Sequence, residues 1–174
     1  MTSVTLERYI LLEHFLVEAN QGDVRAQYNL GLMHKRGNVV PRDDLMASTW
    51  FLKAAAQGNT RSEFSIGTMY YLGEGVPQND SKAAGWFLKA ANKGHADAQN
   101  NLGLQYREGK GVPQSYSKAM EWYKKAAING MGSMYHDGKG IPKSCSKARE
   151  WWTEAARLGD IMAQDNLDRC KYCD

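Results

Sequence analysis

The chain has 174 residues, a formal net charge of +3 at pH 7, and 24% charged residues with both signs interspersed. This length allows one domain with a substantial core, and the charge balance offers neither a basic stripe for nucleic acid nor a polybasic segment for a membrane surface. No apolar run approaches the roughly 18 residues that span a bilayer, so we expect neither nucleic-acid binding nor membrane insertion.

The first twenty residues predict a helix and not a signal peptide. Their apolar patch is interrupted by Glu7, Arg8 and Glu13, and it has neither a basic leading segment nor a small-residue cleavage site. We therefore expect a cytoplasmic protein by default, and a periplasmic or secreted one if the N-terminus was trimmed. The spacing of Phe15 and Ala19 matches the second helix of the repeat described next, which predicts a capping helix.

One block of sequence recurs four times along the chain. Its landmark glycines are Gly31, Gly67, Gly103 and Gly132, and a proline stands ten residues after each, at Pro41, Pro77, Pro113 and Pro142. Two of the intervals between the glycines are 36 residues (67 − 31 and 103 − 67), and the last is 29 (132 − 103). A period of a few tens of residues predicts a stack of repeated units that share one core.

The third unit, residues 98–130, predicts two helices joined by a turn. Apolar or small residues step by four through its first half, at Ala98, Leu102 and Tyr106. The segment Gly109–Pro113 then breaks the helix, Ser115 or Ser117 can cap the next one, and Gly130 is expected to end it. Each unit is therefore predicted to be an αα-hairpin.

The second helix of each unit carries a fixed pattern of rings and alanines. The rings are Trp50–Phe51, Trp86–Phe87, Trp122–Tyr123 and Trp151–Trp152, and alanine pairs follow at 54–55, 90–91, 126–127 and 155–156. Their helical spacing beside apolar neighbours favours core packing over a stacking platform for bases. Because a mid-helix glycine costs about 1 kcal/mol relative to alanine, we expect another helix backbone too close to the landmark glycines for a Cβ.

These patterns predict one solenoid domain over residues 1–174. Its parts are a capping helix at 5–22, repeats at 26–58, 62–94, 98–130 and 131–159, and a C-terminal half-repeat with a tail at 163–174. Half-units at both ends would cover the exposed faces of the stack, as solubility of a one-dimensional array requires.

Two units depart from the pattern. The fourth lacks seven residues between Gly130 and Met131, which is about two helical turns, so we expect a stunted hairpin there. The alternative is that further, disordered residues lie between Gly130 and Met131, which would leave those two residues far apart. In the first unit, Val39 replaces the second turn glycine and Met46 replaces the lysine of the other units.

Residues 5–168 carry the pattern A-x-x-x-L-G-x-x-Y-x-x-G-x-G-V-P-x-x-x-x-K-A-x-x-W-x-x-K-A-A-x-x-G. This pattern resembles the Sel-1-like repeat, a relative of the tetratricopeptide repeat. The resemblance implies an all-α, right-handed solenoid whose first helices line a concave groove. It also implies a non-enzymatic adaptor or scaffold role, and bacterial members of the family are often linked to signalling, secretion or host contact. A secreted or surface-exposed host-interaction factor is therefore one alternative.

A second alternative is enzymatic. Ser115–Lys118 and Ser144–Lys147 both satisfy S-x-x-K, the nucleophile signature of penicillin-recognising enzymes, and a cysteine-rich branch of the resembling family is associated with β-lactam binding. The S-D-N and K-T-G partners of that signature are absent, and both matches fall where serine caps a helix. We expect no enzyme, with a serine hydrolase or β-lactamase-like protein as the alternative.

Neither the cysteines nor the histidines predict a metal or cofactor site. Cys145, Cys170 and Cys173 do not form a disulfide framework, and the terminal C-x-x-C has no second ligand pair. The four histidines occupy different repeat positions, at His14, His34, His95 and His136. We expect neither a bound metal nor a cofactor.

Partner binding is predicted on the first helices, at positions off their apolar stripe where the units differ. The candidates are Asn29, Lys35, Arg36, Ser65, Tyr71, Asn101, Gln105 and Arg107. Asparagine can pair with the backbone of an extended peptide, and Lys35 or Arg107 could hold a carboxylate. The expected partner is a protein or peptide, with a monomer as the default state, and the alternative is that these positions form a merely solvated helix face.

Overall fold

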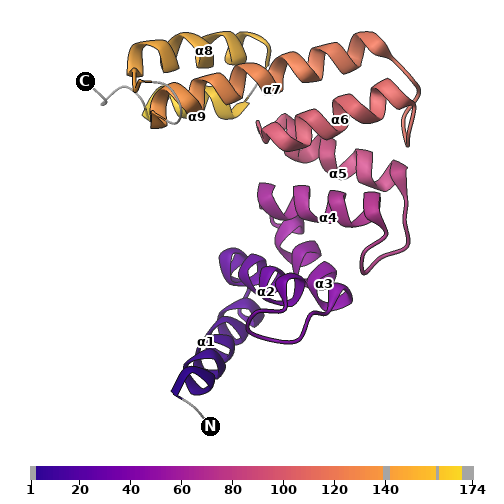
Figure 1. The fold of residues 1–174 in the computed structure, drawn as a ribbon, viewed down its shortest axis with the longest axis vertical. Coiled ribbons are helices and arrows are strands. Elements are labelled where there is room, and N and C mark those ends of the chain that lie inside the picture. The colour runs from indigo at the N-terminus through magenta and orange to yellow at the C-terminus, as the bar shows by residue number, and fades with distance from the viewer. Residues whose placement is uncertain (1–2, 139–141, 160, 170–174) are drawn as a thin grey trace. The chain divides into compact units, whose positions relative to one another are not determined.

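In the computed structural model, residues 3–138, 142–159 and 161–169 are described, and every regular element among them is an α-helix (Figure 1). The helices are α1 Ser3–Asn20, α2 Val24–Arg36, α3 Asp44–Ala56, α4 Thr60–Leu72, α5 Asp80–Asn92, α6 Ala96–Glu108, α7 Tyr116–Asp137, α8 Cys145–Arg157 and α9 Ile161–Arg169. The predicted all-α class is confirmed. The predictions for Cys170 and Cys173 fall outside the described residues.

The chain divides into two compact units, Met1–Trp86 and Phe87–Asp174, with the boundary inside α5. In the first unit α1 packs on α2, α2 on α3, and α3 on α4. In the second unit α6 packs on α7, α7 on α8, and α8 on α9. Helices adjacent in sequence therefore pack together, as a series of hairpins requires, and the single domain expected over residues 1–174 stays a prediction.

Helix ends follow the local sequence signals. Gly109 ends α6 in the left-handed region at φ 69°, and Ser115 caps α7 by accepting a hydrogen bond from the Lys118 N–H. The helix break at Gly109 was predicted and is confirmed, and of the two predicted cap candidates, Ser115 and Ser117, the structure uses Ser115. Asp23 and Asn59 cap α2 and α4 in the same way, with hydrogen-bond lengths of 2.7 and 2.8 Å.

Three of the landmark glycines, Gly31, Gly103 and Gly132, lie against aromatic rings. A Cβ added at Gly31 would stand 2.5 Å from Cδ1 of Phe51, and one at Gly103 would stand 2.7 Å from Cε1 of Tyr123. The expected close neighbour is therefore present, but the expectation of a helix backbone is wrong. The ring fills the groove that the missing side chain leaves, and Phe51 is consequently 1% exposed.

The shortened fourth unit differs from its prediction. Gly130 does not end a helix, because α7 runs for 22 residues through Gly130 and Met131 as one continuous element. The second helix of the third repeat thus continues into the short first helix of the fourth, so the expected helix end at Gly130 is wrong, while residues 131–137 still pair with α8 as a shortened hairpin. Without the seven residues that reverse the chain in the other repeats, the two helical segments share one axis.

Candidate functional site

An open hollow of about 280 Å³ lies in the first unit, beside α2. Three segments line it: α1, α2, and the turn between α2 and α3. The lining residues are Phe15, Asn29, Leu32, Met33, Arg36, Asn38 and Val39. Two of the predicted partner-binding residues, Asn29 and Arg36, are therefore brought together here with residues that the sequence analysis did not nominate.

The periodicity of α2 explains which of its side chains meet at the hollow. Asn29, Leu32, Met33 and Arg36 are spaced by three, four and seven residues, so they share one face of the helix. Met33 is buried, Asn29 and Leu32 are half-buried, and Arg36 is exposed. The face therefore passes from an apolar floor to a charged rim.

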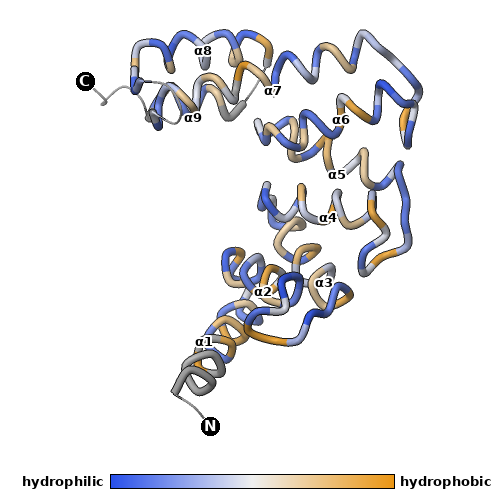
Figure 2. The backbone as a smooth tube through the Cα atoms, viewed as in Figure 1, coloured by the Kyte–Doolittle hydropathy of each residue, from blue (hydrophilic) through white to orange (hydrophobic). Residues whose placement is uncertain are grey.

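The rest of the floor comes from α1 and from the α2–α3 turn. Phe15 and Val39 both pack against the core cluster that contains Met33. In the second repeat the position of Val39 is held by Gly75, where an added Cβ would overlap the Asp44 carbonyl. The first repeat instead places a valine there, and Figure 2 shows the resulting hydrophobic stretch in an otherwise polar turn.

The rim can pair with two kinds of group. The Arg36 guanidinium presents several N–H donors suited to a carboxylate, and the Asn29 and Asn38 amides each offer a donor and an acceptor suited to peptide groups. An apolar floor with a few convergent polar groups is the usual make-up of a small binding site in proteins.

Lys35 belongs to a different arrangement. Its Nζ lies 3.1 Å from Asp44 Oδ1 and 2.6 Å from Glu74 Oε2, so it joins the end of α2 to the turn of the next repeat. Arg42 donates to Asp44 as well, and the hydrogen bonds from Arg42 and then from Lys35 lower the pKa of the Asp44 carboxyl. Because Lys35 already holds two carboxylates of its own chain, it is not counted in the candidate site.

The other two predicted residues of the first unit lie outside the hollow. The Ser65 hydroxyl donates to the Arg61 carbonyl of its own helix at 2.9 Å. Tyr71 is half-buried near the end of α4, where its carbonyl accepts a hydrogen bond from the Gln78 side chain.

The remaining three predicted residues lie on α6, in the second unit. Asn101 is half-buried, and Arg107 is exposed with its Nη2 3.1 Å from Glu108 Oε1. The prediction for Gln105 is wrong. Its side chain is 1% exposed and lies inside the core, so a partner cannot reach it in this structure. Its spacing of three from the buried Leu102 puts it on the inner face of the helix.

The sequence analysis did not nominate Phe15, Met33, Asn38 or Val39. The one available signal was the loss of the second turn glycine, which was noted as a departure from the pattern but not connected to a site. The hollow forms where α1 and that turn pack on the same core cluster. The repeat pattern does not specify this packing, because α1 precedes the first full repeat.

The S-x-x-K matches have structural partners. Ser115 and Ser144 each cap a helix by accepting from the N–H of the residue three positions later, at 3.3 and 3.4 Å. Lys118 Nζ lies 5.3 Å from the ring centroid of Tyr106, and Lys147 lies 5.3 Å from that of Tyr135. Serine and lysine therefore perform separate packing roles in each motif.

In the part of the chain that the structure describes, no helix combines the length and the hydropathy that a membrane span needs. In the same residues, no group of three or more histidine, cysteine, aspartate or glutamate side chains is placed to hold a metal ion.

Comparisons with known proteins give consistent matches. A family model described as Sel1 repeat matches residues 24–59, 60–95, 96–131 and 127–160. The last two stretches overlap at 127–131, where α7 is shared between repeats. A search of curated proteins found no match.

Two solved structures are similar in sequence and fold. One is c5321, described as a protective antigen present in uropathogenic Escherichia coli strains and displaying an SLR fold, with 36% identity and a TM-score of 0.64. The match covers 90% of this chain, which spans only 35% of the length of that one. The other is a Sel1 repeat protein from Oxalobacter formigenes, with 30% identity, a TM-score of 0.64, and 96% and 74% coverage.

Proposed function

Because the chain belongs to the Sel1 repeat family, we propose that it is a protein-binding scaffold whose α1–α2 hollow holds a peptide segment of its partner. Membership of this family and the all-α repeat fold were both expected from the sequence, and both are confirmed. Proteins of this family generally act as interaction scaffolds, and the finer assignment to the hollow is the proposal.

The observation that carries the proposal is the composition of the hollow. Its floor is apolar, from Phe15, Leu32, Met33 and Val39, and Arg36 stands exposed at the rim. This combination fits a peptide that inserts an apolar side chain and carries an acidic residue beside it. The rim asparagines can pair with the peptide backbone, as their mixed donor and acceptor groups allow.

The surroundings of the hollow support rigid presentation. Lys35, one residue before Arg36, is tied to Asp44 and Glu74, which fixes the end of α2. A binding face that is ordered before the partner arrives loses less conformational entropy on binding, which raises affinity for a given set of contacts.

The proposal is tested with the full chain and a short peptide. The probe is an acetylated, amidated hexapeptide with one leucine between two glutamates, compared with a version that carries glutamines. In a ¹⁵N NMR titration the acidic peptide should shift the signals of Asn29, Leu32 and Arg36. Arg36→Ala should lower the affinity for the acidic peptide by about threefold to fivefold, as expected for the loss of one exposed ion pair. The affinity for the glutamine peptide should not change.

The matched control is Arg25→Ala, which removes an exposed arginine of the same helix that lies outside the hollow. It should leave both peptides unaffected. Signals that move only in other parts of the chain, or equal losses in the two variants, would contradict the assignment to the hollow.

One comparison favours the alternative of a host-interaction factor. The Escherichia coli relative is described as a protective antigen present in uropathogenic strains. This alternative changes the compartment in which a partner is met but not the chemistry of the hollow. Antibody labelling of intact cells of the native organism, compared with lysed cells, distinguishes a surface location from an internal one.

A further inference from the structure

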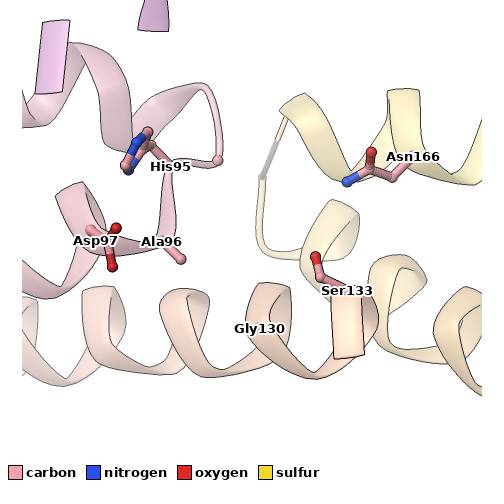
Figure 3. A pocket seen from close by; sticks show the side chains of 7 residues that line it. His95, Ala96, Asp97, Gly130, Ser133 and Asn166 are labelled. Carbon is pink, nitrogen blue, oxygen red and sulfur yellow. The ribbon is translucent and has the colours of Figure 1, made fainter. Parts of the chain in front are cut away.

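A second recess, of about 330 Å³, lies within the second unit beside the middle of α7. Residues 94–97 line one side, from the α5–α6 turn and the start of α6, while Gly130 and Ser133 of α7 and Asn166 of α9 complete it. Figure 3 shows His95 and Asp97 on one side of the recess, with Ser133 and Asn166 on the other.

The recess adjoins the point at which the fourth repeat is shortened. Gly94 and Gly130 hold the same repeat position, 36 residues apart. At Gly94 the chain turns with φ 82° and His95 caps the next helix, whereas at Gly130 the chain continues as helix. The seven residues that would follow Gly130 in a full-length repeat are absent, so a turn and the start of a first helix are missing beside this recess.

The walls of the recess are polar. Asp97 contributes an exposed carboxylate, Ser133 an exposed hydroxyl and Asn166 a half-buried amide. His95 uses Nδ1 to accept from the Ala98 N–H at 3.4 Å, which leaves Nε2 as the other polar atom of its ring. The lining residues include neither lysine nor arginine, so Asp97 supplies the formal charge.

Gly130 also allows another chain to approach the α7 backbone closely at the floor of the recess. A Cβ added at Gly130 would meet no atom within 4 Å, so no neighbour in the described structure requires glycine at this position. Where a helix exposes glycine, another backbone can approach it more closely than a side chain would allow.

We propose that this recess takes a short helical segment of a partner protein, one or two turns long, which presents small and polar side chains and a basic residue to Asp97. The segment would take the place of the first-helix turns that the fourth repeat lacks. It would thereby extend the helix-on-helix packing that already joins α6 to α7 and α8 to α9. This site is separate from the hollow in the first unit and does not depend on it.

The charge of the recess favours a cation over an anion. The N-terminus of α6 faces the same space and, by its dipole, would attract negative charge. Asp97 sits in the first turn of that helix and already supplies a carboxylate there, so a second anion would be repelled. A lysine or arginine of the partner meets no such opposition.

The test uses ¹⁵N-labelled full chain and two acetylated, amidated peptides. The first repeats residues 94–107 of this chain, which include the seven residues absent after Gly130, and the second replaces the aspartate equivalent to Asp97 with lysine. We expect the lysine peptide to shift the signals of Ser133 and Asn166 and to bind about threefold to fivefold more tightly than the aspartate peptide, as for one exposed ion pair. In the Asp97→Lys variant this order should reverse.

Two further variants test the place of binding. Gly130→Leu should keep α7 helical and fill the recess, because nothing stands within 4 Å of an added Cβ, and it should abolish binding of both peptides. Insertion of the seven residues His95–Asn101 after Gly130 should restore a full repeat and likewise abolish binding.

The proposal is overturned if neither peptide shifts Ser133 or Asn166, or if Asp97→Lys and Gly130→Leu leave their binding unchanged. If spermidine alone shifts the Ser133 and Asn166 signals as much as the peptides do, the recess is a site for small cations. That result would overturn the proposal that a helical segment occupies it. Signal shifts confined to Asn29 and Arg36 would overturn the proposed binding at the recess and would support binding at the hollow. The two proposals can therefore fail separately.

Discussion

The ammonium of Lys82 lies over the ring of Tyr70, with Nζ 5.2 Å from the ring centroid. The same pair recurs one repeat later as Lys118 over Tyr106, at 5.3 Å. In the first repeat both positions change together, to Met46 and His34. The lysine of the repeat pattern therefore joins the start of the second helix to the end of the first through a cation–π contact.

This cation–π contact predicts a measurable coupling free energy between Lys118 and Tyr106 in the third repeat. Lys118→Ala and Tyr106→Leu should each destabilise the chain, and a double-mutant cycle should give a coupling of about 0.5–1 kcal/mol, the usual range for exposed cation–π pairs. Urea unfolding of the four proteins measures it. Additive effects of the two substitutions would mean that Lys118 and Tyr106 do not interact in solution.

A second prediction separates the two glycines of α7. Gly130→Ala should stabilise the chain by up to about 1 kcal/mol, since alanine favours helix and the new Cβ meets nothing within 4 Å. Gly132→Ala should instead destabilise it by about 1–3 kcal/mol, because its Cβ would overlap the Trp152 indole. Urea midpoints of the two variants should therefore move in opposite directions. Destabilisation by both would argue that α7 breaks at Gly130 in solution.

The contrast between Gly94 and Gly130 also shows where sequence reasoning succeeded and where it failed. Hairpins, caps and turn glycines were predictable because each depends on a few adjacent residues. The helix end at Gly130 was mispredicted from its glycine alone. The cap acceptor that follows Gly22, Gly58 and Gly94, at Asp23, Asn59 and His95, is replaced after Gly130 by Met131. Without that acceptor a new helix has no start signal, and the old helix continues.

The candidate site was less predictable because it depends on tertiary contacts. Asn29 and Arg36 were predicted because they lie off the apolar stripe of a first helix, at positions where the repeats differ. Phe15 and Val39 reach the same hollow only because α1 and the α2–α3 turn pack against the same core cluster. Lys35 was chosen for its charge, and only the structure reveals that Asp44 and Glu74 already hold it.

A third prediction concerns the stability of this ion cluster against acid. The pKa of Asp44 is lowered in the folded chain, first by the hydrogen bond from Arg42 and then by that from Lys35. A depressed carboxyl pKa contributes stability above the unfolded value of about 3.9, and this contribution is lost as the pH falls through the folded pKa. Asp44→Asn should therefore destabilise the chain at pH 7 and have progressively less effect below about pH 4.

Thermal unfolding across that pH range measures the difference between Asp44→Asn and the original chain. Added salt should reduce it at pH 7, because the cluster is partly exposed and therefore screened. The neighbouring Asp43→Asn is the control, since its amide oxygen can still cap α3 at the Met46 N–H. An Asp44→Asn effect that does not change with pH would show that the cluster adds no linked stability.

The last prediction concerns a buried glutamine that seals the junction between successive repeats. Gln99 donates from Nε2 to the Ala91 carbonyl at 3.0 Å, and Gln27 makes the equivalent bond to the Ala19 carbonyl at 3.0 Å. Both carbonyls belong to the last turn of a helix, and each also accepts from the N–H of the glycine three residues later, Gly94 to Ala91 at 3.0 Å and Gly22 to Ala19 at 3.1 Å. Gln99→Ala removes this second hydrogen bond to the Ala91 carbonyl and leaves a cavity where a fully buried side chain stood, so it should cost about 1–3 kcal/mol in urea unfolding. Asn100→Ala, at the exposed neighbouring position, should change stability by less than about 0.5 kcal/mol. Equal effects of the two substitutions would show that the Gln99 bond does not hold the α5–α6 junction together.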